Sequence, residues 1–195
     1  MLSAIFTPVR PTSSPARSTA QAGLLVALCL VIRRQLTPQV PFLNLGGLPL
    51  LLSGLLLGAR GGAAVGAVSD VLGFLISSPG PYHPFYTLTA TLTAALPPLL
   101  LNRGRALDRV PTWIALLAAV STTQVLTKVL LIPTLQAHLS ATSWQPLAKL
   151  SAGVQVVHIP AYTVILRLLL EGLLPRTKHG GAATPAQDGQ QPTWN

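Results

Sequence analysis

The fold of this chain is decided by residues 45–93, LGGLPLLLSGLLLGARGGAAVGAVSDVLGFLISSPGPYHPFYTLTATLT. In this stretch a series of glycines and one aspartate recurs every four positions: Gly54, Gly58, Gly62, Gly66 and Asp70. Small residues at this spacing let helices approach closely inside a membrane. The prolines at 79, 81 and 84 then interrupt any helix, because each lacks a backbone donor and restricts its predecessor. We therefore expect two close-packed apolar helices, a polar loop, and a further helix that begins near Thr87.

The composition indicates a membrane protein. The chain has 195 residues, enough for one domain, and only 9% of them are charged, whereas soluble domains average about a quarter. The net charge of +9 does not indicate binding to nucleic acid, because the cations lie singly or in small groups between apolar blocks. The single cysteine, Cys29, allows no disulfide within the chain and is expected to pack in the core.

Six apolar segments are expected to form membrane helices in an all-α bundle. They cover residues 17–35, 42–57, 61–76, 86–101, 112–132 and 147–174. The second and third are shorter than the roughly 20 residues that a straight span needs. Arg60 is expected to mark a tight turn between these two helices.

The connections and chain ends are polar. Residues 133–146 are expected to form a polar connection, and residues 1–18 and 176–195 to be flexible tails around a helical domain at 19–175. If the N-terminus is inside, eight Lys and Arg residues fall in inner segments and only two in outer segments, Arg33 and Arg34. This bias predicts that both termini are cytoplasmic.

Four ionisable residues lie within the expected helices, where each costs about 2.5 to 3.5 kcal/mol near a helix centre: Asp70, Lys128, Lys149 and Arg167. The side chain of Arg167 can reach the lipid headgroups. Lys128 and Lys149 are expected near outer helix ends, on the side of the loop that carries Tyr82, His83 and Tyr86. Asp70 can neutralise one lysine, so the other could hold a planar anionic solute beside the aromatic residues. The alternative is a structural Asp–Lys pair and an interfacial aromatic belt.

The sequence contains no familiar catalytic or metal-binding motif. Its four histidines, His83, His138, His158 and His179, are not spaced as in HExxH, and no phosphate-binding loop of the type GxxxxGK[ST] occurs. His158 is expected to be a packed or hydrogen-bonded core residue. Any energy from ATP must therefore come through a partner.

A resemblance to a known family covers about residues 19–175. It is carried by LGGLPLLLSGLLLGARGGAAVGAVSDVLGFLI, PGPYHPFYTLTATLTA and PLAKLSAGVQVVHIPAYTVIL. These segments resemble the substrate-binding subunits (S components) of energy-coupling factor (ECF) vitamin transporters, in particular the folate branch. That family shows a glycine-rich helix pair, an S-D-x-x-G element, and a Pro-x-Tyr/Phe loop before a threonine-bearing helix. The chain departs from the pattern at Phe85 and Tyr86, and at LLIPTL in the fifth helix.

The resemblance implies a six-helix S component of the bacterial cell membrane, with no enzymatic activity and no cofactor of its own. Such a subunit captures a vitamin from outside and delivers it to a transmembrane T component and two ATPases. Folate or a relative would be bound by Asp70, Tyr82, His83, Tyr86, Thr87, Lys128 and Lys149. The carboxylates of folate suit the two lysines. A face of small residues on the first helix would dock against the partners: Thr19, Gly23 and Ala27.

Two alternatives stay open at this point. The ligand could be another vitamin or a base precursor, such as thiamine, riboflavin or a queuosine precursor. The chain could also be a membrane scaffold whose small-residue faces only pack against other helices.

Overall fold

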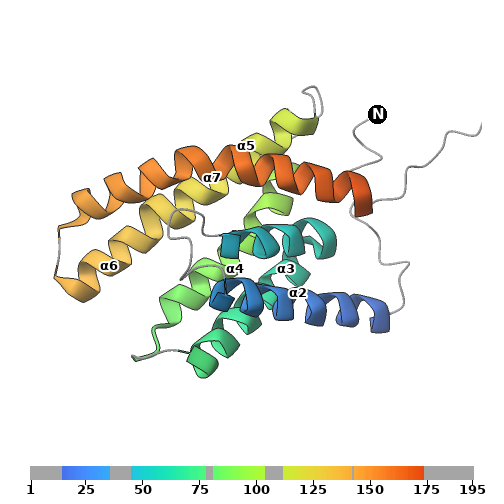
Figure 1. Ribbon diagram of the computed structural model, residues 1–195, viewed down its shortest axis with the longest axis horizontal. Helices are drawn as coiled ribbons and strands as arrows, with labels where there is room; N and C mark the ends of the chain where they lie inside the picture. Colours follow the sequence, from blue (N-terminus) through green and yellow to red (C-terminus); the bar gives the residue numbers. More distant parts are fainter. Residues whose placement is uncertain (1–14, 36–44, 78–80, 104–111, 142, 174–195) are drawn as a thin grey trace, which may run out of the picture.

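The computed structural model describes residues 15–35, 45–77, 81–103, 112–141 and 143–173, and these are almost entirely helical (Figure 1). The helices are α2 (Pro15–Gln35), α3 (Leu48–Ser77), α4 (Pro84–Arg103), α5 (Thr112–Gln124), α6 (Ile132–Ser140) and α7 (Trp144–Leu173). A 3-10 helix, η1 (Leu45–Gly47), precedes α3, and a π-helix, η3 (Val125–Leu131), joins α5 to α6. The predicted C-terminal tail at 176–195 lies outside the described residues. Of the predicted tail at 1–18, only the last four residues are described, and they belong to α2.

The described part of the chain contains four helical stretches that are long and apolar enough to cross a membrane. They are Leu45–Ile76, Pro84–Asn102, Thr112–Ser140 and Trp144–Gly172, and a shorter apolar helix covers Ala16–Ile32. The prediction of an all-helical membrane protein is therefore confirmed.

Helix α3 folds back on itself at Gly58, where φ is 75° and ψ is 177°. This backbone conformation is essentially restricted to glycine. A β-carbon on Gly62 would lie 2.6 Å from the Cα of Gly54, although residues eight apart in a straight helix are separated by about 12 Å. The predicted pair of short helices is thus present as two arms of α3, residues 48–57 and 59–77. The turn lies at Gly58 rather than at Arg60.

The other glycines of the series bring α3 against the backbone of α4. A β-carbon on Gly54 would lie 1.8 Å from the carbonyl oxygen of Ala94, and one on Gly66 would lie 2.7 Å from that of Ala90. Pro98, inside α4, has no N–H to donate to the carbonyl of Ala94 four residues earlier. The carbonyl that the proline leaves unpaired in α4 therefore lies against the bare backbone of Gly54.

The four threonines that begin α4 are helical, and the hydroxyls of the last three find acceptors one turn back. Thr89 donates to the carbonyl of Phe85 at 2.8 Å, and Thr91 donates to the carbonyl of Thr87 at 2.7 Å. Thr93 donates in the same way to Thr89 at 2.7 Å. These bonds satisfy the hydroxyls within one helix, as an apolar environment requires.

The prediction of a polar connection over residues 133–146 was wrong. The helix continues through η3 and α6 and ends only at Ser140, after which Ala141 is left-handed with a φ of 50°. The predicted boundary fell at Pro133, a residue that cannot donate a hydrogen bond within a helix. The π-helix η3 lies directly before it, and local π geometry lets a helix rearrange its bonds around a proline.

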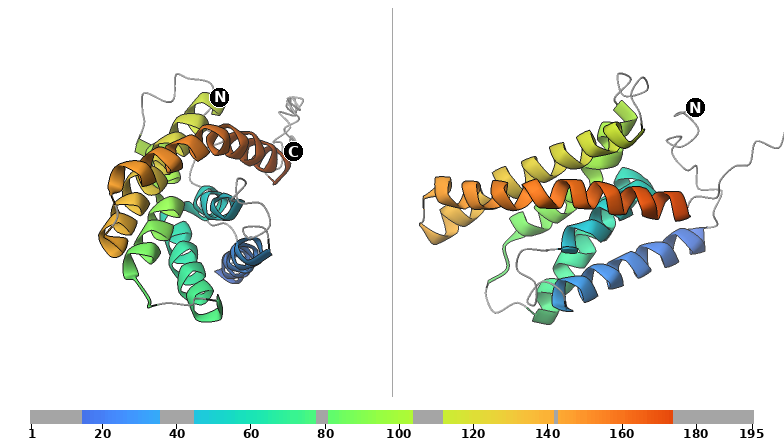
Figure 2. Two further views of the ribbon diagram at one scale, coloured as in Figure 1. Left: turned by 60° about the vertical axis from the view of Figure 1, so that its left-hand side comes forward. Right: turned by 45° about the horizontal axis from the view of Figure 1, so that its top comes forward.

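The helices form a bundle in which α5, η3 and α6 make one continuous rod that runs antiparallel to α7 (Figures 1 and 2). The α6–α7 turn and the start of α4 lie toward one end of the bundle. The starts of α2 and α5 and the end of α7 lie toward the other end (Figures 1 and 2). Helix α2 packs against α3.

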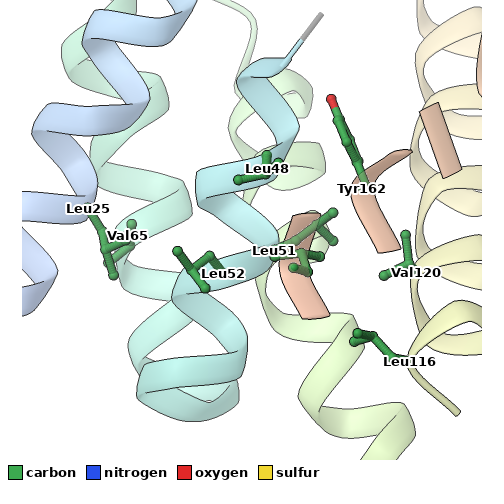
Figure 3. Close-up of a cluster of buried hydrophobic side chains, with 9 residues drawn as sticks. Leu25, Leu48, Leu51, Leu52, Val65, Leu116, Val120 and Tyr162 are labelled. Carbon is green, nitrogen blue, oxygen red and sulfur yellow. The ribbon is translucent and has the colours of Figure 1, made fainter. Parts of the chain in front are cut away.

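The main apolar core surrounds the first arm of α3 (Figure 3). It joins α2, α3, α5 and α7 through Leu25, Leu48, Leu51, Leu52, Val65, Leu116, Val120, Tyr162 and Leu166. The first arm has about ten residues and is only about 15 Å long, too short to span lipid alone. Neighbouring helices enclose this short arm and shield it from lipid. The same packing fixes the position of η1, which forms part of the site described next.

Candidate binding cavity

A cavity of about 690 Å³ lies among η1, α3, α4, the α5–η3–α6 rod and α7. Pockets for small molecules usually have volumes of about 300 to 1,000 Å³ and combine apolar walls with a few polar groups. Here the apolar part of the wall includes Leu50, Ala90, Ile132 and Val154. The cavity therefore has the size and the lining of a site for an organic molecule.

The rod contributes four lining residues at a spacing of four: Gln124, Lys128, Ile132 and Gln136. In a regular α-helix, residues four apart drift by about 40° around the axis, and residues twelve apart drift by about 120°. Such drift would turn Gln136 away from the face that Gln124 occupies. The wider turns of η3 lie between these two residues and offset the drift. The π-helix thus keeps Lys128 and Gln136 on the cavity side.

Helix α7 contributes a stripe of polar and aromatic residues to the cavity wall. Ser151, Gln155, His158 and Tyr162 follow one another at helical spacing and line the cavity. The rings of His158 and Tyr162 stack with their centroids 5.5 Å apart and their planes at 28°. Both residues are buried, as expected for His158, and they also place an aromatic surface in the wall.

Lys149 lies outside this wall. It is exposed and does not line the cavity, because its position two residues before Ser151 turns it about 160° away from the stripe. Arg167 is also exposed on α7, where its Nε donates to Oε1 of Glu171 at 2.8 Å. The structure therefore brings only one of the two predicted lysines, Lys128, to the cavity.

Asp70 comes to the cavity from the second arm of α3 and is 6% exposed. The hydroxyl of Thr87 donates to its Oδ2 at 2.8 Å, and the hydroxyl of Tyr82 lies 2.6 Å from that of Thr87. Because Thr87 has a single hydroxyl hydrogen, Tyr82 is the donor in the second bond. The ring of Tyr82 also packs edge-on against Phe74 at 5.1 Å. A hydrogen-bonded chain thus connects the buried carboxylate to the segment before α4.

The other residues predicted for the site divide into three groups. Tyr86 lines the cavity together with Asp70 and Lys128. Tyr82 and Thr87 are connected to it through Asp70. His83 is half-buried and, like Lys149, is not part of the cavity wall.

Sequence reasoning missed most of the wall contributed by α5 and α7. Gln124, Gln155 and Tyr162 were not singled out, and His158 was expected only in the core. Their helical spacing was the available signal for a shared face. Gln124 lies one turn before Lys128, and Gln155 lies one turn before His158 and two turns before Tyr162. Among the described residues, no three His, Cys, Asp or Glu side chains come together as a metal site would require.

The small residues of α2 lie on its outer face. Thr19, Gly23 and Ala27 are all exposed, and a β-carbon on Gly23 would have no described atom within 4 Å. Leu25 and Cys29 on another face of the same helix are buried in the bundle. The face carrying the small residues is therefore available within the described part of the chain.

Comparison with known proteins gives two matches. The family described as ECF-type riboflavin transporter, S component, matches residues 14–174. The curated protein "Folate transporter FolT" of Clostridium novyi (strain NT) is 36% identical over 76 residues, which cover 38% of this chain and 44% of that protein. The chain thus matches less than half of the length of this curated relative.

Proposed function

The chain belongs to the family of ECF-type riboflavin transporter S components, and on this premise we propose that it is the vitamin-binding subunit of an importer. It is a multi-pass protein of the bacterial cell membrane, and its family is one of transport subunits and not of enzymes. The proposed ligand is folate or a related anionic vitamin, captured from outside the cell.

The observation that carries this proposal is the combination of groups in one cavity. Lys128 supplies a cation, and His158 with Tyr162 supplies an aromatic surface between apolar walls. An ammonium group suits a carboxylate, and an aromatic surface suits a flat ring. Asp70 lies in the same wall and is held by Thr87. We assign it the role of organising the cavity, with Tyr82 and Tyr86 near the entrance.

Riboflavin is the second candidate, and the description of the matching family supports it. The similarity to a folate transporter supports folate. The two vitamins differ in charge, because folate carries carboxylates and riboflavin carries none. We propose folate because one of its carboxylates would bind Lys128, while Asp70 in the same wall is held by Thr87.

Calorimetric titration of the purified protein with folic acid, riboflavin and thiamine tests the assignment. We expect saturable binding of folic acid, and a folate that copurifies with the protein would agree with it. Saturable binding of a different vitamin with no response to folic acid would overturn the choice of ligand. If the chain were only a scaffold, no vitamin would stabilise it, whereas a ligand at 100 times its dissociation constant adds about 2.7 kcal/mol.

We further propose that the chain crosses the membrane six times with both termini in the cytoplasm. The six segments are α2, the two arms of α3, α4, the rod and α7. Two features support this topology, namely the charge bias of the sequence and the grouping of helix ends at opposite ends of the bundle (Figure 2). The helical domain expected at residues 19–175 then begins at Pro15, with the start of α2.

The proposed partners are a transmembrane T component and two ATPase subunits, which would supply the energy from ATP. The exposed face of Thr19, Gly23 and Ala27 on α2 is the proposed docking surface. Its small side chains would permit close helix contact in the membrane. The cavity lies on other helices, so docking and vitamin binding can be altered separately.

A further inference from the structure

Two glutamines in the cavity wall are buried without complete hydrogen bonding. Gln124 is 1% exposed and Gln155 is 8% exposed. The side-chain oxygen of each has no hydrogen-bond partner among the described residues. Buried carbonyl groups without a donor are costly and rare in native proteins, so each one requires an explanation.

The two amides lie around the aromatic pair of the cavity. Gln155 precedes His158 by three residues and Tyr162 by seven, which places all three on one stripe of α7. Gln124 reaches the same place from α5. Its Nε2 lies 3.7 Å from the point where a β-carbon on Gly47 would be, and the ring of Tyr162 lies 3.3 Å from that same point. The two glutamines with unsatisfied oxygens therefore line the same cavity as the aromatic pair, one from each of two facing helices.

We propose that Gln124 and Gln155 determine specificity by accepting hydrogen bonds from the N–H groups of a flat heteroaromatic ligand. A ring beside His158 and Tyr162 would present its edge to side chains from both helices, and ring N–H or amino groups on that edge would supply the missing donors. The glutamine carbonyls and the N–H groups of the ligand are all uncharged. Their recognition is therefore independent of the bond between Lys128 and an acidic group. This inference rests on the proposed function, because it assigns a chemical class to the ligand of the same cavity.

The test compares ligands that differ only in one donor. The probes are two pairs of ligands. Folic acid is compared with its 2-desamino-2-methyl analogue, which lacks the 2-amino donor. Riboflavin is compared with 3-methylriboflavin, which lacks the N3–H donor. For whichever vitamin binds, we expect the wild-type protein to bind the analogue about tenfold more weakly by calorimetry. Gln124→Met and Gln155→Met remove the carbonyl at nearly constant side-chain length. Each variant should bind the parent vitamin more weakly, and the discrimination should fall to about twofold or less in the variant that lacks the acceptor of the missing donor.

Gln145→Met is the matched control, because Gln145 is exposed at the start of the same helix as Gln155. This variant should retain the full discrimination. If a methionine variant fails to fold, Gln155→Asn replaces it. Asparagine keeps the amide but is one methylene group shorter, so its carbonyl lies farther from the ligand. The discrimination should then fall in the same way.

The outcomes separate this inference from the proposed function. Full discrimination in both methionine variants would overturn the inference alone, and so would a wild-type protein that binds the vitamin and its analogue equally. A merely structural role for the glutamines would lower affinity for both members of a pair and leave their ratio unchanged. Absence of saturable binding of folic acid and riboflavin by the wild type would overturn both proposals.

Discussion

Replacing Gly54 with alanine is expected to destabilise the protein, although alanine is the better helix former. The added β-carbon would lie 1.8 Å from the carbonyl oxygen of Ala94. Overpacking of this kind costs about 1 to 3 kcal/mol. The upper end applies here because the obstacle is backbone that cannot rotate away. Alanine recovers about 0.5 to 1 kcal/mol of helix propensity, so the net loss should be about 2 kcal/mol.

The single cysteine provides the assay. Cys29 is 5% exposed in the core, so a thiol-reactive dye reports the temperature at which the bundle opens. For a chain of this size, 1 kcal/mol shifts the melting temperature by about 2 to 4 °C. We therefore expect Gly54→Ala to lower the melting temperature in detergent by about 4 to 8 °C.

The control is the same substitution at Gly153 in α7. A β-carbon on Gly153 would have no described atom within 4 Å. Gly153→Ala should leave the melting temperature unchanged or raise it, because only the gain in helix propensity remains. Equal melting temperatures for the two variants would refute the close contact between the first arm of α3 and α4.

Three further predictions concern the site and the docking face. Lys128→Met should weaken folate binding roughly tenfold to a hundredfold, whereas Lys149→Met should change it by less than about twofold; equal losses by calorimetry would contradict the placement of the two lysines. Thr87→Val should lower the free energy of unfolding by about 1 to 3 kcal/mol by leaving Asp70 without this donor, and Asp70→Asn should lose stability and affinity together. A well-folded Asp70→Asn variant without binding would instead indicate direct contact with the vitamin. Gly23→Leu should preserve calorimetric binding and abolish uptake by cells that contain the partner subunits, and loss of both would argue against a docking face.

The glycine series shows how much of the packing is encoded locally. Its spacing predicted close helix contact, and Gly54, Gly62 and Gly66 each meet backbone within 3 Å of an added β-carbon. Gly58 has a different role, since its positive φ makes the turn. Spacing alone could not separate these roles, because a glycine in a turn and a glycine in a contact look identical in the sequence.

The site was predicted less completely than the bundle. Asp70, Tyr86 and Lys128 line the cavity, because rare charges and aromatic residues stand out in an apolar chain. Lys149 was assigned to it from its position along the helix without regard to the direction around the helix. Gln124 and Gln155 carry no charge, so only their arrangement in three dimensions distinguishes them from surface glutamines.

The wrong boundary at residue 133 has a specific physical cause. A proline normally ends a helix, and the polar residues that follow it reinforced that expectation. Hydrophobic patterning does not reveal a π-helix, whose hydrogen bonds skip one residue more than those of an α-helix. The extension of the rod to Ser140 therefore could not be predicted from residue types alone.

The π-helix makes one wall of the cavity depend on backbone geometry as well as on residue types. If Val125–Leu131 had regular α geometry at the same length, Gln136 would turn by about 120° from the face of Gln124 and leave the wall. If one residue of this segment were deleted as well, the eleven remaining steps would turn about 1,100°, and Gln136 would return to within about 20° of that face. A relative that lacks one residue here and is α-helical throughout would thus keep the same wall, and residues aligned across the gap would face the cavity in both proteins.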